Sequence, residues 1–230
     1  HLRNTCQPDR TTRDYAGLSP MMLLFPTDTP LYRTTAKEHP TLLGYLVGPR
    51  KRGIPHFLRS GNILWAADND AYSQSFNPKT FLDWLRTIAP YKDRCLFVAC
   101  PDVVGDAAAT LARFHAWRPR LENLDLPIAY VLQNGAMPDT VPWTAIDAVF
   151  VGGTTDWKMG PDPLQLLVHA GRLGLWRHVG RVNSVKRMHH FWPFADSFDG
   201  TTFAIRPDNA LRAFLPEMLS RSHQGKLQWS

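Results

Sequence analysis

The residues with the clearest chemical potential are three aspartates that lie after or within short apolar runs: Asp68, Asp102 and Asp199. Such runs are typical of strands buried on both faces, and the carboxyl ends of parallel strands carry the ligand sites of α/β proteins. One carboxylate can attack a glycosidic carbon while a second handles protons, as in retaining glycosidases, where the pair stands about 5 Å apart. The spacing permits this chemistry without selecting it.

Amide side chains and glycines follow neighbouring runs. Asn69 follows Asp68, and Gln133 directly follows the run at 128–132. Gly152 and Gly153 follow the run at 148–151. A carboxylate accepts from the ring N–H and exocyclic amine of a guanine-like base, and an amide donates to its carbonyl. Glycines let backbone N–H groups approach a flat ligand. Any one of these residues more often caps a helix or forms a turn, but their recurrence at successive strand ends predicts a ligand site.

The elements that must position these residues alternate between strands and helices. Helical spacing and capping residues predict helices over 78–88, 107–121, 164–173 and 207–219. Eight strand candidates predict a compact (β/α)8 TIM-like barrel, and an open doubly wound sheet is the alternative, although no G-x-G-x-x-G follows the first strand. The predicted strands are 22–25, 44–47, 63–67, 95–99, 128–132, 148–151, 178–182 and 197–203.

Composition and charge narrow the class of protein. The chain has 230 residues and 44% hydrophobic content, which suit one domain at 21–230 after an N-terminal extension at 1–20. No apolar run approaches the roughly 18 residues of a membrane span, and no signal peptide is evident, so we expect a cytoplasmic protein without a membrane partner. Residues 1–60 and 171–230 each carry a net charge of +5, which suits a polyanionic partner or an ordinary solvated surface.

Five short segments at the predicted strand ends carry a family resemblance. They are ILWAADN (63–69), VACPD (98–102), VLQNG (131–135), VGG (151–153) and FDGT (198–201). In this order they resemble the tRNA-guanine transglycosylase superfamily. GGTTDWK (152–158) and GRVNS (180–184) resemble more closely its DNA-acting branch, the phage and bacterial enzymes that insert 7-deazaguanines into DNA. The resemblance covers about residue 20 to about residue 205.

The resemblance implies a role for each matching residue. Asp199 matches the nucleophile that attacks C1′ and leaves a covalent enzyme–DNA intermediate, and Asp68 matches the base that takes a proton from the incoming base. The expected reaction exchanges guanine for a 7-deazaguanine such as 7-cyano-7-deazaguanine, with no cofactor. The residues expected to bind the base are Asp102, Gln133, Gly152, Gly153 and Asn69.

The chain also departs from the family pattern. Relatives acting on tRNA carry a zinc site of three clustered cysteines and a histidine near the C-terminus, whereas Cys6, Cys95 and Cys100 cannot supply it. We therefore expect no metal and a DNA substrate, and buried thiols at Cys95 and Cys100. Asp70 stands where the family commonly has glycine, and its charge either raises the pKa of Asp68 or faces solvent.

Basic residues near the predicted strand ends are the candidates for DNA phosphate contacts. His178, by contrast, lies alone on its predicted strand, and His189 and His190 face different directions, so we expect no metal ligand among them. The candidate phosphate contacts are Arg50, Lys51, Arg52, Arg59, Lys158, Arg181, Lys186 and Arg187.

Three other functions stay open. One is a zinc-free tRNA-guanine transglycosylase, another is a non-catalytic barrel that binds nucleic acid or a base, and a third is a glycosidase with Asp68 and Asp199 as its pair. The expected partners are DNA and a 7-deazaguanine base, while a homodimer, accessory modification proteins and a bacterial or phage origin are undecided. If the protein is phage-encoded, its location is the cytoplasm of the bacterial host.

Overall fold

The first and last strands of the chain, β1 (Met22–Phe25) and β8 (Ser197–Phe198), pair in parallel and close an eight-stranded barrel. The computed structural model describes residues 21–50, 56–61, 63–71 and 76–227. All neighbouring strands run parallel in chain order, which makes the fold a (β/α)8 TIM-like barrel, as predicted. The other strands are β2 (Leu43–Val47), β3 (Trp65–Ala67), β4 (Cys95–Ala99), β5 (Ile128–Leu132), β6 (Ala148–Val151) and β7 (Trp176–Val179).

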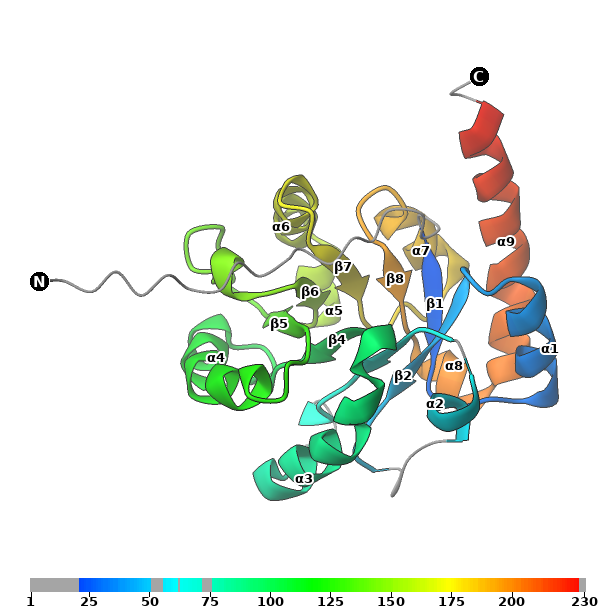
Figure 1. Cartoon of the computed structure of the whole chain (residues 1–230). Helices are drawn as coiled ribbons and strands as arrows, with labels where there is room; N and C mark the ends of the chain where they lie inside the picture. Colours follow the sequence, from blue (N-terminus) through cyan, green and yellow to red (C-terminus); the bar gives the residue numbers. More distant parts are fainter. Residues whose placement is uncertain (1–20, 51–55, 62, 72–75, 228–230) are drawn as a thin grey trace, which may run out of the picture.

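Helices alternate with the strands and surround the barrel (Figure 1). Two 3-10 helices, η2 (Ala89–Arg94) and η3 (Trp143–Ala145), precede β4 and β6. None of the helices within the described ranges is long and apolar enough to cross a membrane. The α-helices are α1 (Pro30–Glu38), α2 (His56–Ser60), α3 (Pro78–Ile88), α4 (Ala107–Glu122), α5 (Thr155–Lys158), α6 (Pro161–Arg172), α7 (Val185–Phe191), α8 (Thr201–Ile205) and α9 (Pro207–Leu227).

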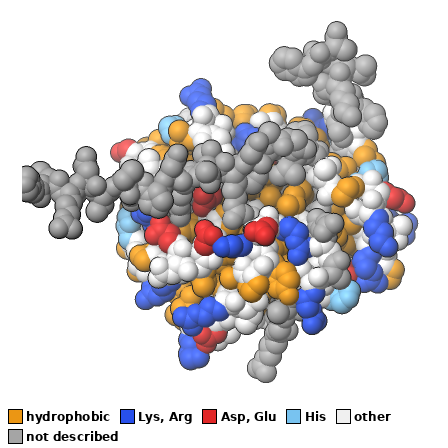
Figure 2. Space-filling view, in the orientation of Figure 1, with side chains coloured by type: hydrophobic (Ala, Val, Ile, Leu, Met, Phe, Trp, Pro, Cys, Tyr) orange, Lys and Arg blue, Asp and Glu red, His pale blue; other side chains and the backbone are white. Residues whose placement is uncertain are grey.

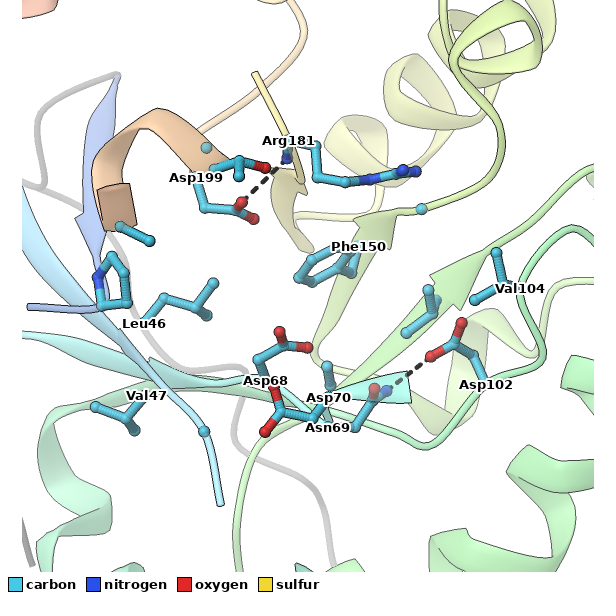
Figure 3. A pocket seen from close by; sticks show the side chains of 18 of the residues that line it. Leu46, Val47, Asp68, Asn69, Asp70, Asp102, Val104, Phe150, Arg181 and Asp199 are labelled. Carbon is cyan, nitrogen blue, oxygen red and sulfur yellow. Dashed lines mark hydrogen bonds between the residues drawn. The ribbon is translucent and has the colours of Figure 1, made fainter. Parts of the chain in front are cut away.

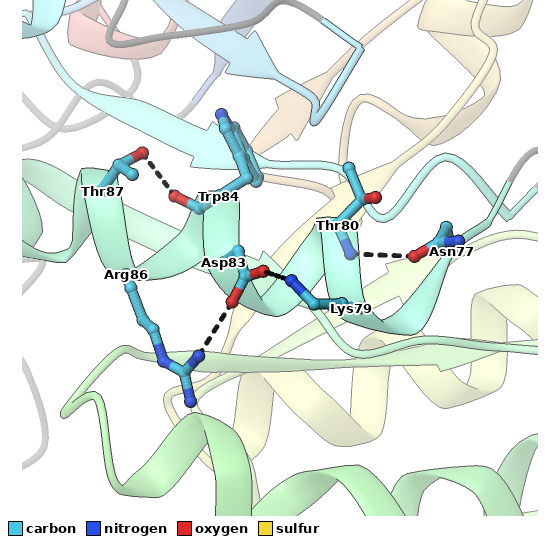
Figure 4. Close-up of polar contacts among 7 residues, drawn as sticks. All are labelled: Asn77, Lys79, Thr80, Asp83, Trp84, Arg86 and Thr87. Atoms are coloured by element: carbon cyan, nitrogen blue, oxygen red, sulfur yellow. Dashed lines mark hydrogen bonds and ion pairs between the residues drawn. The ribbon is translucent and has the colours of Figure 1, made fainter.

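Helix starts follow the capping chemistry of the sequence. Asn77 accepts a hydrogen bond from the Thr80 N–H at 2.9 Å and opens α3, whose exposed face pairs Asp83 with Lys79 and Arg86 (Figure 4). The predictions for 78–88 and 107–121 are confirmed to within one residue. The prediction for 164–173 was late, because Gly160 rather than a later residue is the N-cap, and that for 207–219 was short.

Alternate residues along the strands divide the core into two layers. Leu23 and Phe25 belong to the larger cluster, which includes the buried faces of the helices, so this cluster lies between strands and helices. Met22 and Leu24 belong to a smaller cluster that also contains Trp176, and this cluster fills the inside of the barrel. His178, two residues beyond Trp176 on β7, therefore also points inward, toward the barrel axis.

The last two strands differ from their predictions. We predicted a strand at 178–182, but β7 begins at Trp176 and ends before Gly180, because Arg181 takes a left-handed backbone with φ 58°. The predicted strand at 197–203 ends at Phe198, and Gly200 then caps α8. The Val182 N–H donates to the Asp199 carbonyl at 2.7 Å, which brings the segments after β7 and β8 together.

The two basic segments of the chain meet only in part. Pairing of β1 with β8 brings part of the segment at 1–60 next to part of the segment at 171–230. On the face shown in Figure 2, Lys and Arg side chains lie at several places and are interspersed with acidic ones. The N-terminal extension predicted at 1–20 lies outside the described residues.

Candidate active site

A cavity of about 300 Å³ opens at the carboxyl ends of the strands (Figure 3). Asp199 enters it from the end of β8, and Asp68 and Asp70 enter from the opposite side, after β3. Leu46 and Phe150 supply apolar walls between these acidic groups. The cavity therefore has the mixed lining of a small-molecule site, apolar walls with a few convergent polar groups. Its further polar and glycine lining is Gly48, Asn69, Asp102, Gln133, Gly152, Gly153, Arg181, Gly200 and Thr201.

Asp199 is held by a donor at each carboxylate oxygen. His178 Nε2 lies 2.9 Å from Oδ2, and the Arg181 N–H donates to Oδ1 at 3.0 Å. Burial alone raises the pKa of this carboxyl, but the hydrogen bonds from His178 and the Arg181 N–H, together with the positive charge of Lys158, outweigh burial. The pKa of Asp199 therefore lies below its ordinary value, and the group is an anion at neutral pH.

The pKa of Asp68 is shifted in the opposite direction. Burial raises its pKa to about 7, and the negative charges of Asp199, Asp70 and Asp102 add to the effect. Of the two alternatives left open for Asp70, the structure favours a charge that raises the pKa of Asp68, although Asp70 also pairs with Arg50 at 3.6 Å. Asp68 can hold or release a proton near neutral pH, whereas Asp199 cannot.

Asp102, Asn69 and Gln133 form one buried hydrogen-bond network. Asn69 Nδ2 donates to Asp102 Oδ1 at 2.8 Å, and Gln133 Nε2 donates to Asp102 Oδ2 at 2.6 Å. The Gly105 and Gly153 N–H groups donate to Gln133 Oε1 at 2.8 and 2.9 Å, which fixes the amide with its nitrogen toward Asp102. Burial raises the pKa of Asp102, and the two side-chain donors oppose this effect. Each Asp102 oxygen keeps acceptor capacity beyond its one side-chain donor.

Gly152 and Gly153 serve the cavity through packing. Their N–H groups donate to Leu132 O and to Gln133 Oε1, so both N–H groups already have partners within the protein, and contact of these glycines with a base stays a prediction. A Cβ on Gly152 would lie 2.6 Å from Gln133 Nε2. Gly153 has φ 69°, and a Cβ there would lie 2.4 Å from the Trp157 ring. Both positions therefore require glycine to keep Gln133 and the loop after β6 in place.

The basic candidates occupy different environments. The Arg181 guanidinium lines the cavity and donates to the Gly153 carbonyl, and Arg50 lies beside Asp70 at the same mouth. Arg187 is half-buried on α7 near the end of β7, and Lys186 and Arg59 are exposed. Lys51 and Arg52 lie outside the described residues.

Lys158 differs from its prediction as a surface phosphate contact. Its side chain is 3% exposed, and Nζ donates to the Gly180 carbonyl. Burial lowers its pKa to about 7, with a further contribution from Arg181. Gly180 O and the Arg181 N–H belong to one peptide group, so Lys158 braces the peptide that donates to Asp199. Lys158 therefore stabilises the site from the protein interior and does not lie on the surface where a polymer could contact it.

His178 and its neighbours are the functional residues that our sequence analysis missed. We considered His178 only as a metal ligand, whereas it is fully buried and faces Asp199. Two-residue spacing was the available signal, because Trp176 and His178 share the inner face of β7, and Asp199, just beyond β8, is two residues from Ser197 on that strand. Within the described residues, no three His, Cys, Asp or Glu side chains gather as a metal site, and Cys95 and Cys100 are buried thiols as predicted.

Comparisons with known proteins bear on the fold. No protein-family model matches the chain, and no curated protein matches it. A designed cube-shaped porous protein cage is 11% identical with a TM-score of 0.54, and covers 91% of this chain and 75% of its own. A native KDPGal structure is 9% identical with a TM-score of 0.51, and covers 90% of this chain and 97% of its own. These likenesses show the fold alone.

A lower-scoring match shares only part of its length with this protein. L-talarate dehydratase from Polaromonas sp. JS666 is 15% identical with a TM-score of 0.43, and the match covers 80% of this chain. This chain spans 53% of the dehydratase. A shared fold does not determine function, which depends on the side chains of the site.

Proposed function

We propose that this protein exchanges guanine in DNA for a 7-deazaguanine base through a covalent intermediate on Asp199. The observation that carries the proposal is the opposite displacement of two pKa values in one cavity. The pKa of Asp199 lies below its ordinary value, and that of Asp68 is raised to about 7. Two carboxyls separated in this way divide into an anionic nucleophile and a proton carrier. These are the roles that the resemblance implies for the same two residues.

The chemistry proceeds in two displacements. An Asp199 oxygen attacks C1′ of a deoxyguanosine, the C1′–N9 bond breaks, and guanine leaves with the bonding electron pair. Protonated Asp68 supplies the proton that guanine needs. The incoming base then gives its N9 proton to ionised Asp68 and attacks C1′, which releases the Asp199 carboxylate. One proton is returned in each cycle, so no cofactor is required.

Recognition of the base falls to the buried network on the other wall. An Asp102 carboxylate with acceptor capacity to spare suits the N1–H and exocyclic amine shared by guanine and its 7-deaza analogues. Gln133 is held with its Nε2 side toward Asp102, where an N–H can donate to the base carbonyl. A cavity of about 300 Å³ is at the small end of ligand sites and suits one base, with the polymer outside.

DNA requires an additional step. A base in a duplex is out of reach, so the target nucleotide must flip out at a cost of a few kcal/mol or come from unpaired DNA. Arg50 and Arg181 at the mouth of the cavity suit the flanking phosphates. Neither residue specifies deoxyribose, and the choice of polymer rests on the resemblance.

Base exchange is the direct test. The protein is incubated with radiolabelled guanine and with duplex DNA, single-stranded DNA or unmodified tRNA, and label is counted in the recovered polymer. We expect label in DNA that is lost in Asp199→Asn and kept in Asp106→Asn, a matched change at the exposed N-cap of α4. Label in tRNA alone would favour the zinc-free tRNA enzyme. DNA binding without exchange would favour a non-catalytic reader, and sugar hydrolysis would favour the glycosidase.

A further inference from the structure

We propose that Ser197, oriented by Trp176, keeps His178 as a neutral Nε2–H donor to Asp199, so that the Asp199 carboxylate retains its full negative charge. The hydrogen-bond chain stands on geometry alone. Its consequence for nucleophilic attack rests on the proposed function. Ser197 and Trp176 do not line the cavity, so they are positioning residues that act through His178.

The four groups form a continuous buried chain from the barrel interior to the cavity. Trp176 Nε1 lies 2.9 Å from Ser197 Oγ, and Ser197 Oγ lies 2.8 Å from His178 Nδ1. His178 Nε2 lies 2.9 Å from Asp199 Oδ2. Trp176 is 3% exposed, and Ser197 and His178 are 0% exposed, so water does not compete for these bonds. Register supports the arrangement, because His178 and Ser197 are direct partners on β7 and β8.

Proton positions along the chain are determined at both ends. An indole N–H only donates, so Ser197 Oγ accepts from Trp176, and its own O–H is directed to His178 Nδ1. An ionised carboxylate only accepts, so His178 Nε2 carries the proton that faces Asp199. The hydrogen bond made by one ring nitrogen selects the tautomer at the other.

Each alternative state of His178 leaves a polar group poorly satisfied. A neutral Nδ1–H ring would point its Nε2 lone pair at Asp199 Oδ2, with two acceptors 2.9 Å apart. An imidazolium would make Ser197 Oγ accept from both Trp176 and His178, so its O–H would lose Nδ1 as an acceptor. A buried hydroxyl that loses its acceptor destabilises the state in which this happens.

The charged surroundings of His178 point the same way. The ionisable groups that act on the ring are Asp199, beyond β8, and Lys158, on α5. Burial and the positive charge of Lys158 lower the pKa of His178, and Asp199 raises it; burial is the largest effect and the net direction is downward. The His178 ring also packs against the uncharged Phe97 and Phe150 rings, with centroids 5.1 and 4.5 Å away.

A neutral donor has a specific consequence for Asp199. A neutral His178 orients the carboxylate and leaves the pair with a net charge of −1. An imidazolium in the same place would neutralise the pair and weaken Asp199 as a nucleophile. Ser197 thus acts by donating its O–H to Nδ1, which keeps this nitrogen unprotonated.

Nitrogen-15 NMR of the full-length protein tests this series of hydrogen bonds without any assay of activity. The His178 signals are identified among the nine histidines by their loss in His178→Gln. We expect a neutral Nε2–H ring in the wild type from pH 8 down to pH 6. In Ser197→Ala, which frees Nδ1, we expect protonation to shift upward by about one pH unit or more. A wild-type Nδ1–H ring, or an imidazolium at pH 7, would overturn the proposal, as would an unshifted titration in folded Ser197→Ala.

Kinetics test the consequence for Asp199. We expect Ser197→Ala to slow covalent trapping of DNA at pH 6 by roughly 10- to 100-fold, as loss of the outer hydrogen-bond partner does for metal-bound imidazoles. The loss should disappear as pH rises, the KM for the base should stay unchanged, and Ser197→Thr should restore the hydroxyl and the rate. Thr35→Val, a matched hydroxyl deletion at a buried site on α1, should not change the pH profile. A pH-independent loss would overturn this role.

The two proposals fail separately. If His178 is a neutral Nε2–H ring but the protein exchanges no base, the proposed function is wrong and the hydrogen-bond arrangement is supported. Base exchange by a protein whose His178 is an imidazolium would do the reverse. Trp176→Phe gives an independent variant, because it removes the donor that orients Ser197, and it should shift His178 protonation in the same direction as Ser197→Ala.

Discussion

Gln133 Nε2 lies 2.6 Å from Asp102 Oδ2, and both side chains are at most 6% exposed. The two residues follow adjacent strands, β4 and β5, and neither is satisfied without the other. Because the Gln133 oxygen is occupied by the Gly105 and Gly153 N–H groups, only its nitrogen can face Asp102. This pair therefore presents a defined donor and acceptor pattern to the cavity before any ligand arrives.

Gln133→Glu tests that pattern. The substitution keeps the oxygen that accepts from Gly105 and Gly153 but places a second acidic group against Asp102. We expect the KM for guanine to rise about 10- to 100-fold and the free energy of unfolding to fall by about 1–3 kcal/mol at pH 8. The loss should shrink at pH 4, where an acidic group is protonated and can donate. Equal destabilisation at both pH values in urea titrations would contradict this account.

Asp68 should make the protein less stable as pH rises. Its folded pKa of about 7 lies above the ordinary value, so the folded state binds more protons than the unfolded state between about pH 4 and pH 7. The free energy of unfolding attributable to Asp68 therefore falls across this window. Asp68→Asn should remove that slope and stabilise the protein at pH 8 by on the order of 3 kcal/mol.

The measurement is the free energy of unfolding at several pH values, for the wild type and Asp68→Asn. Base exchange should be lost in the same variant, because an amide carries no transferable proton. A variant that gains stability at pH 8 and loses exchange would match both roles of Asp68. A variant whose stability follows the wild-type slope would show that Asp68 has an ordinary pKa.

Lys158 should have the opposite pH signature. Burial lowers its folded pKa to about 7, so between about pH 7 and pH 10 the unfolded state binds more protons, and stability attributable to Lys158 rises with pH. Lys158→Met keeps the volume of the stem and removes this rise. The variant should also slow covalent trapping by about tenfold, because the Gly180–Arg181 peptide loses its brace. Unfolding at pH 7 and pH 10, with trapping kinetics, checks both expectations.

Gly153→Ala separates packing from backbone strain. Gly153 and Gly174 have nearly equal φ values of 69° and 70°, but a Cβ at Gly153 meets the Trp157 ring at 2.4 Å, and one at Gly174 meets nothing within 4 Å. Gly174→Ala should cost about 1 kcal/mol for the left-handed backbone. Gly153→Ala should cost a further 1–3 kcal/mol or so for overpacking, and should weaken base binding through Gln133. Equal melting temperatures for the two variants would contradict the packing argument.

Much of the barrel was predictable from local sequence. Apolar runs gave the strands β1, β4, β5 and β6 with their observed bounds, because strands buried on both faces need no polar alternation. Caps such as Asn77 and Asp106 located helix starts, since capping is local chemistry. Asp68, Asp102, Gln133 and Asp199 were placed at one mouth for a topological reason: parallel strands in one sheet end on the same side.

The sequence by itself therefore determined the fold and the set of acidic and amide groups around the cavity, because strand periodicity and helix capping depend on residues near one another in the chain. Tertiary structure alone decided how those groups behave. The opposite pKa displacements of Asp68 and Asp199, the burial of Lys158 and the contact of His178 with Asp199 all arise between side chains from different strands. Burial and electrostatic coupling depend on distance in space, and that distance is set only when the barrel closes.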